Sequence, residues 1–181
     1  MTIKDSQRSR VYAAEQDAWS QVLREMPEMR RFDQKGRTLA EAQEIIRALA
    51  DRKLVIKHYP NASRLRRTKV EPGRNAGRAY SWNNTITLGV YGRERTWLLL
   101  HEAAHIYAGI GHDWAFADAY LYLWRQVFGV QAAKILEAQF KAHRVRYRKP
   151  RKTQPLTLAK RKELVARLAA AREAKALQSV G

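Results

Sequence analysis

The sequence predicts an α+β fold in which a small β-sheet or hairpin packs on one helix and on further helices, followed by a basic helical C-terminal tail. Three observations support this fold class. Apolar residues recur at helical spacing in several segments, short strand-like runs flank a pair of asparagines, and positive charge is concentrated at the C-terminal end. A chain of 181 residues with 45% hydrophobic residues and no cysteine can build one core without disulfides.

The N-terminal part of the chain is expected to form two helices. Residues 8–26 place alanine and valine side chains at helical spacing, and Pro27 with the charged residues behind it interrupts the pattern. The next helix is predicted to begin after Thr38. Thr38 and Glu41 have the spacing of a capping box, and an apolar stripe follows them.

The middle of the chain carries the predicted strands. Residues 54–56 form a short apolar run that is typical of a strand. Residues 61–78 are rich in arginine and contain glycine and proline, so they are interpreted as a basic loop. Two further strand-like pieces, 79–82 and 85–88, are separated by two asparagines. Because asparagine tolerates the left-handed conformation of a tight turn, we expect a hairpin here.

Three helices are predicted after the hairpin. The first covers residues 97–108 and is stopped by Gly109. Asp113 is a suitable N-cap for the second helix, which runs to residue 128, and the third covers residues 131–144. The second helix carries large aromatic side chains that we expect in the core: Phe116, Tyr120, Trp124 and Phe128.

The charge of the chain indicates a polyanionic partner. Lysine and arginine number 35 against 17 acidic residues, which leaves a net charge of +18. Residues 141–181 contain thirteen of the basic and only two of the acidic side chains. Such a tail is predicted to contact DNA or RNA non-specifically through backbone phosphates. The candidate nucleic-acid-binding residues are Arg144, Arg146, Arg148, Lys149, Arg151, Lys152, Lys160, Arg161 and Lys162.

We divide the chain into three parts. Residues 1–37 are interpreted as an N-terminal helix and linker, residues 38–144 as the domain that carries the chemistry, and residues 145–181 as a basic linker with a helical tail. The N-terminus lacks the apolar segment of a signal peptide, and no apolar run approaches the ~18 residues that a transmembrane helix needs. A cytoplasmic protein without a membrane partner is the resulting expectation.

Residues 101–105, His-Glu-Ala-Ala-His, form the most specific pattern in the chain. In a helix, residues four apart share one face, so His101 and His105 can bind the same metal ion. The pattern is typical of zinc sites, in which imidazole nitrogens lie ~2.0–2.1 Å from the metal. Glu102 follows the first histidine directly and is the candidate general base. It would accept a proton from a water molecule at the open metal position.

A catalytic zinc usually has three protein ligands, and its fourth position is left to water. His112 is the favoured third ligand, because a turn with glycines at 109 and 111 lets the chain reverse. Asp118 and Glu137 are the alternatives. Asp113 is better explained as the helix cap or as a partner that orients an imidazole. We expect one zinc ion (Zn²⁺) per chain.

The residues around this pattern resemble a known family. The run Trp97-Leu-Leu-Leu-His-Glu-Ala-Ala-His105, followed by Gly111-His112-Asp-Trp-Ala-Phe116, is similar to the SprT-like (Spartan-type) zinc metallopeptidases. In that family an H-E-x-x-H helix is followed by a segment that donates the third histidine, and a hairpin precedes the helix. The resemblance implies a minimal zincin-like domain, a hydrolase in which His101, His105 and His112 bind zinc and Glu102 acts as base.

The resemblance also bears on the substrate. Family members with a nucleic-acid-binding tail cleave proteins on DNA, so a protein or peptide substrate is implied here, with nucleic-acid-associated proteins as a special case. An extended substrate is expected to add as a strand along residues 85–88. Tyr80, Tyr107, His58 or an arginine are candidates for stabilising the oxyanion of the reaction.

Two other functions are weighed against the peptidase. A metal-dependent endoribonuclease of the YbeY type would suit the basic charge, but Glu102 stands where that group has glycine. A non-enzymatic nucleic-acid-binding adaptor would contain a structural zinc. Structural zinc sites usually have four protein ligands, often cysteines, and this chain has none.

Overall fold

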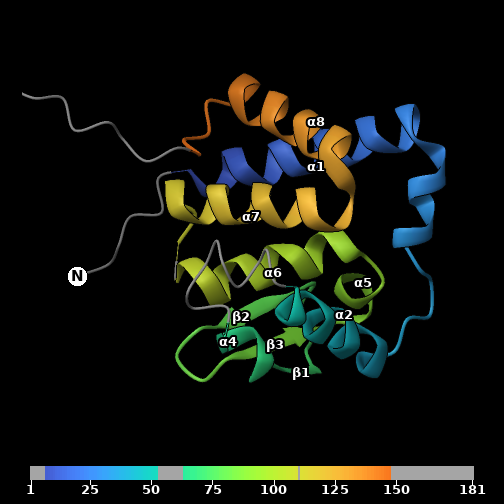
Figure 1. The fold of residues 1–181 in the computed structure, drawn as a ribbon, viewed down its shortest axis with the longest axis vertical. Coiled ribbons are helices and arrows are strands. Elements are labelled where there is room, and N and C mark those ends of the chain that lie inside the picture. Colours follow the sequence, from blue (N-terminus) through green and yellow to red (C-terminus); the bar gives the residue numbers. More distant parts are fainter. Residues whose placement is uncertain (1–6, 53–62, 110, 148–181) are drawn as a thin grey trace, which may run out of the picture. The chain divides into compact units, whose positions relative to one another are not determined.

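The structure is a computed structural model of the chain, and it describes residues 7–52, 63–109 and 111–147. All of these belong to one compact unit, Met1–Lys149. None of the helices within these ranges is long and apolar enough to cross a bilayer. In chain order the elements are α1 (Arg8–Glu25), the 3-10 helix η1 (Pro27–Phe32), α2 (Leu39–Asp51), α4 (Ser63–Arg66), β1 (Lys69–Pro72), β2 (Arg78–Tyr80), β3 (Thr85–Leu88), α5 (Val90–Arg93), α6 (Thr96–Ala108), α7 (Trp114–Val127) and α8 (Gly129–Ala142) (Figure 1).

The described chain is α+β, mostly helical with one small mixed sheet, which confirms the α+β part of the predicted fold class; the predicted helical tail lies outside the described residues. The strand order is β1-β3-β2, with β1 parallel and β2 antiparallel to β3. The hairpin is also confirmed, because β2 and β3 pair across a turn in which Asn84 adopts a φ of 54°. The strand predicted at residues 54–56 lies outside the described residues.

Two predictions about the sheet are wrong. Residues 61–78 are not a continuous loop, because they contain α4 and β1. β1 is an edge strand with mostly exposed side chains, so it lacks the alternating apolar pattern by which a half-buried strand is recognised. The second error concerns substrate binding. β3 is the central strand and is hydrogen-bonded on both sides, so residues 85–88 cannot receive an added strand.

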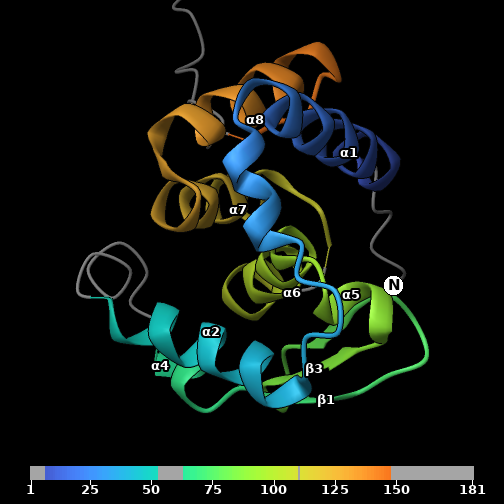
Figure 2. The same ribbon diagram turned by 90° about the vertical axis from the view of Figure 1, so that its right-hand side faces the viewer.

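The helix α6 lies between the sheet and α7 in both views, and α1 and α8 pack together beyond α7 (Figures 1 and 2). Helix α6 is therefore buried on nearly all sides, and its residues Leu99, Leu100, Ala103 and Ala104 are fully inaccessible to solvent. The aromatic side chains of α7 fill the space next to α6, as predicted. Phe116, Tyr120 and Trp124 are fully buried, and Phe128 is 4% exposed.

The N-terminal helix is joined to the far end of α8. The side chain of Gln7 donates to the backbone carbonyl of Arg146 and accepts from its backbone N–H, at 3.2 and 3.0 Å. Val145 is buried, and the Tyr147 hydroxyl donates to Glu137. These contacts hold α1 in place above α6 and α7, which matters because α1 contributes side chains to the site.

Candidate metal centre

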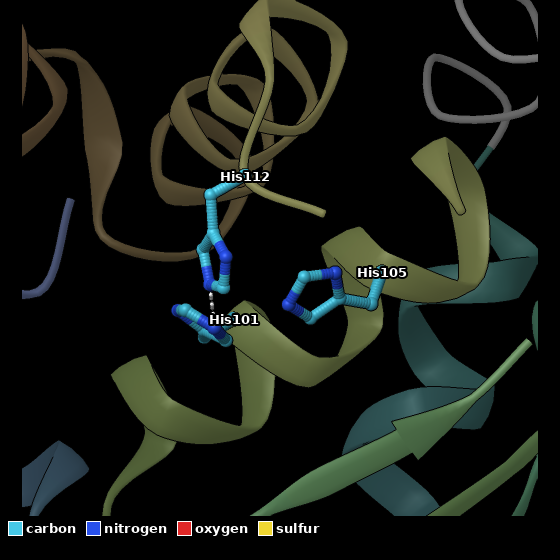
Figure 3. Close-up of side chains that lie close together, drawn as sticks. All are labelled: His101, His105 and His112. Atoms are coloured by element: carbon cyan, nitrogen blue, oxygen red, sulfur yellow. Dashed lines mark hydrogen bonds between the residues drawn. The ribbon is translucent and has the colours of Figure 1, made fainter. Parts of the chain in front are cut away.

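Three histidines converge on one point at the C-terminal half of α6 (Figure 3). Each offers a nitrogen, and these atoms all lie within 4.8 Å of one another. His101 and His112 are buried, His105 is partly buried, and the Nε2 atoms of His101 and His112 are 3.1 Å apart. This group could hold a metal ion. The alternative ligands Asp118 and Glu137 do not belong to it.

The local sequence explains how the three rings meet. His101 and His105 are one helical turn apart on α6, so they share a face. Directly after the helix in the chain, Gly109 and Gly111 adopt φ values of 88° and 112°, which residues other than glycine rarely adopt. The chain therefore reverses and returns His112 to the helix. Asp113 then caps α7, as predicted, by accepting hydrogen bonds from the backbone N–H groups of residues 115 and 116.

Two of the imidazoles are oriented by hydrogen bonds from their Nδ1 atoms. His101 Nδ1–H donates to Glu15 Oε1 at 2.5 Å, and His105 Nδ1–H donates to the carbonyl of Gly109 at 3.1 Å. A protonated Nδ1 leaves the lone pair of Nε2 for a metal. Both rings are therefore held in the tautomer and the direction that a metal ligand requires.

Glu15 is the residue that sequence reasoning missed. It lies on α1, 86 positions before His101, and is fully buried between the helices. One signal was available, because Glu15 stands on the apolar face of α1, four residues after Val11 and seven before Val22. A carboxylate on a buried helical face needs a partner. Only the tertiary structure identifies that partner as a histidine of the metal centre.

Aromatic rings surround the histidines. Phe116 packs against His101, His105 and His112, with ring centroids 4.8, 4.4 and 4.7 Å away. Tyr12 of α1 stacks on His101 at 5.3 Å and meets His112 edge-on at 5.2 Å. Phe116 is fully buried and excludes water from its side of the centre, and both rings restrict rotation of the imidazoles.

Burial and neighbouring charges together shift the pKa values of the site residues. Burial lowers the pKa of His105 to about 3, helped by the neighbouring His101 and His112, so His105 is neutral at physiological pH. Burial also acts to lower the pKa of His101, but the Glu15 carboxylate outweighs it and the pKa is raised. The pKa of Glu102 is raised by burial, against the opposing effects of His101, a hydrogen bond from the Ala79 backbone and the charge of Arg78.

The Glu102 carboxylate is held against the chain that leads into β2. It is 6% exposed and accepts a hydrogen bond from the backbone N–H of Ala79. A Cβ atom on Gly77 would lie only 2.7 Å from Glu102 Oε1, closer than real Cβ contacts come. Glycine at position 77 is therefore what allows the backbone to approach the carboxylate this closely.

A cavity of about 570 Å³ opens beside the centre. Glu102, His105 and His112 face it, and its walls come from α1, from residues 75–81 and from the turn after α6. Tyr80 and Tyr107, two of the residues expected to stabilise an oxyanion, do not line this cavity, and His58 lies outside the described residues. Its lining residues are Arg8, Tyr12, Asn75, Ala76, Gly77, Arg78, Ala79, Ser81, Glu102, His105, Gly109, Gly111 and His112.

Of the candidate nucleic-acid-binding residues, the structure describes two. Arg144 and Arg146 follow the C-terminal end of α8 in the chain, and both are exposed. The carbonyl of Arg144 accepts a hydrogen bond from Arg10. Arg148, Lys149, Arg151, Lys152, Lys160, Arg161 and Lys162 lie outside the described residues.

The fold and the site together define a helical α+β protein with a buried three-histidine centre, a carboxylate beside it and a cavity in front. No family model, curated protein or solved structure matches the chain. Its function is therefore inferred from the chemistry of these residues.

Proposed function

We propose that the protein is a zinc-dependent metallopeptidase. The observation that carries this proposal is the convergence of His101, His105 and His112 within 4.8 Å of one another, with Glu102 facing the same cavity. Three imidazoles without further ligands are the donor set of a catalytic zinc site, and they suit zinc better than magnesium or calcium, which prefer oxygen. The SprT-like resemblance of residues 97–116 points to the same activity.

The surroundings of the histidines also fit a cation. Glu15 Oε2 is buried and has no hydrogen-bond partner within the described ranges. A buried carboxylate is costly unless positive charge compensates it. His101 bridges Glu15 to the centre, so a divalent ion bound at His101 would supply that charge through the imidazole.

Glu102 would carry the proton transfers. When bound, zinc would polarise the peptide carbonyl and lower the pKa of water. The Glu102 carboxylate accepts a proton as water adds to the carbonyl carbon, and the carbonyl electron pair moves onto oxygen. The carbonyl then re-forms, the C–N bond breaks, and Glu102 returns the proton to the leaving nitrogen. The contacts with Ala79 and Gly77 hold the carboxylate in place for both transfers.

Tyr12 is the best-placed group to stabilise the oxyanion. Its ring lies against His101 and His112, and it lines the cavity that Glu102 faces. Its hydroxyl is hydrogen-bonded to Arg8. An arginine can only donate, so the phenol oxygen accepts and its hydrogen is left to donate into the cavity. An extended substrate would add along β2, an edge strand with residues in the cavity wall, rather than along β3.

The decisive experiment is the Glu102→Gln variant. The substitution is nearly isosteric and leaves the histidines intact, so folding and zinc content should match the wild type. Cleavage of an unfolded protein such as casein, measured with and without DNA, should fall by ~10²–10⁴-fold, the usual size of a general acid–base contribution. His105→Ala is the contrasting variant and should lose the metal as well.

Other outcomes would point to other functions. If the wild type cleaves RNA in a Glu102-dependent way and never cuts a protein, the site belongs to an endoribonuclease. If the wild type and Glu102→Gln bind nucleic acid equally and neither cleaves any substrate, the zinc centre is structural and the protein is an adaptor.

A further inference from the structure

The β2–β3 hairpin carries an exposed aromatic side chain in its turn. Trp82 is 78% exposed, a larger fraction than that of the other exposed large apolar side chains in the described ranges. The turn is closed, because the backbone N–H of Asn83 donates to the carbonyl of Tyr80 at 3.3 Å and Asn84 adopts a φ of 54°. A single exposed ring needs no explanation in itself, so the neighbouring residues decide what Trp82 can bind.

The register of the sheet places a second ring and a cation next to this turn. Thr85 of β3 pairs with Lys69 of β1 on one side and with Tyr80 of β2 on the other. Paired residues of neighbouring strands point to the same face of a sheet, so Lys69, Thr85 and Tyr80 form one row. Lys69 is exposed and Tyr80 is partly exposed. The backbone N–H of Lys69 also donates to the carbonyl of Asn84 at 3.0 Å, which ties this row to the turn.

The next row on the same face adds a second cation. Arg78 and Glu71 pair with Thr87 from opposite sides, and the Arg78 guanidinium lies 5.3 Å from the centroid of the Tyr80 ring. Arg67, shortly before β1 in the chain, is also exposed. Glu71 reduces the positive potential toward the end of β1, so a polyanion is favoured at the end of the sheet that carries the turn.

We propose that this end of the sheet binds single-stranded nucleic acid. An unpaired base stacks on Trp82, the Tyr80 ring offers a second platform, and Lys69 and Arg78 bind phosphates. Aromatic rings interleaved with cations suit single strands of any sequence, because every base has an aromatic face and every nucleotide has a phosphate. We call Lys69, Arg78, Tyr80 and Trp82 the hairpin surface.

The chemistry of the hairpin surface favours unpaired bases over two other partners. In a duplex each base face is covered by the neighbouring base, so an exposed indole has no face on which to stack. An apolar peptide side chain is usually enclosed by a concave pocket, whereas the Trp82 ring is open to solvent. The net charge of +18 also favours a polyanion over a peptide of ordinary composition.

The hairpin surface adjoins the metal centre. Ser81, which stands between Tyr80 and Trp82 in the chain, lines the cavity that Glu102 faces, and Arg78 lines it as well. A strand stacked on Trp82 would therefore hold a protein attached to it beside this cavity. The proposed binding adds base contacts to the phosphate contacts expected of the basic tail, and it does not depend on peptidase activity.

Fluorescence anisotropy of the zinc-loaded full-length protein with three labelled probes tests the stacking. The probes are a short oligothymidylate, an abasic strand with the same number of phosphates, and the duplex of the oligothymidylate with oligoadenylate. The variants are Trp82→Ala, Trp82→Phe and, as a matched control, Tyr91→Ala. Tyr91 is 51% exposed on α5, beyond the other end of β3, so its replacement also removes an exposed ring.

Trp82→Ala should weaken oligothymidylate binding by about 5- to 20-fold, the lower part of the range for a base-stacking ring, because the tail still binds phosphates. Its binding of the abasic strand and of the duplex should not change, since neither offers a free base face. Trp82→Phe should keep most of the affinity, and Tyr91→Ala should keep all of it. A Trp82-dependent loss with oligothymidylate or with oligouridylate supports the proposal and identifies the strand as DNA or RNA.

Lys69→Gln tests the phosphate contacts, with Lys134→Gln as its control. Lys134 is exposed on α8, so its replacement changes the net charge equally but away from the hairpin surface. Lys69→Gln should weaken binding of the oligothymidylate and the abasic strand alike. It should also reduce the slope of log affinity against log salt by about 0.7, the value of one phosphate contact on a single strand. An unchanged slope would overturn the assignment of Lys69.

Tryptophan emission gives a readout that is independent of affinity. A base stacked on an indole quenches its fluorescence, so oligothymidylate should quench the wild type. This quenching should largely disappear in Trp82→Phe, although the other four of the five tryptophans remain. Quenching that persists in Trp82→Phe, or an equal loss of abasic-strand binding in Trp82→Ala, would overturn the stacking. Unchanged nucleic-acid binding together with weaker protein cleavage in Trp82→Ala would assign the ring to a peptide substrate and overturn the proposal.

Discussion

The contact between Gly77 and Glu102 gives the sharpest test of the site geometry. In Gly77→Ala the new methyl group would lie 2.7 Å from Oε1, 2.9 Å from Cγ and 3.1 Å from Cδ of Glu102. Glu102 is 6% exposed, so its side chain cannot move out into solvent without breaking its contacts. The substitution should therefore push the carboxylate away from its present position.

The size of the effect follows from two opposing terms. Gly77 does not have a positive φ, so alanine is compatible with its backbone conformation. Alanine also reduces the conformational freedom of the unfolded chain, and this effect alone would stabilise the protein by about 0.4–1 kcal/mol. Overpacking of a filled site costs about 1–3 kcal/mol. We expect a net loss of about 1–2 kcal/mol in the free energy of unfolding. Displacing the base by ~1 Å should lower kcat by about 100-fold.

Urea unfolding of the zinc-loaded protein measures this loss, and a double-mutant cycle isolates its cause. In a Glu102→Ala background the methyl group at position 77 no longer meets a carboxylate. Gly77→Ala should then be neutral or slightly stabilising, with a coupling energy of about 1–3 kcal/mol. An equal cost in both backgrounds, or a stabilising effect in the wild type, would refute the close approach.

Three further predictions concern the ligands and the tail. The Glu15→Gln side chain can still accept a hydrogen bond from His101, so this variant should weaken zinc binding about 10-fold, whereas Glu15→Ala should weaken it about 100-fold. Chelator competition measures both affinities. Equal losses would mean that the hydrogen bond does not orient the ring. His112→Ala should weaken zinc binding by ~10–100-fold or more, while Asp113→Ala should cost about 1 kcal/mol of stability and little metal affinity. A protein that ends at Lys149 should stay folded and zinc-loaded and lose most salt-dependent nucleic-acid binding; unchanged binding would exclude the tail as the anchor.

The features that could be predicted from the sequence are local ones. The capping box of Thr38 and Glu41 and the Asp113 cap are both present, because each depends on residues three positions apart at most. The shared face of His101 and His105 follows from the helical repeat alone. The position of Asn84 in a hairpin turn follows from the same short-range geometry.

Only the tertiary structure decided which distant residues complete the site. Glu15 and Tyr12 reach the histidines because α1 packs beside α8 and over α7, an arrangement that no spacing within α1 encodes. The strand order places β3 in the centre of the sheet and β2 at its edge. An extended substrate is therefore expected to pair with β2 and not with β3, as the sequence had suggested. The contact between Glu15 and His101 joins residues 86 positions apart. The free energy of such long-range contacts comes from packing complementary surfaces rather than from local conformational preference.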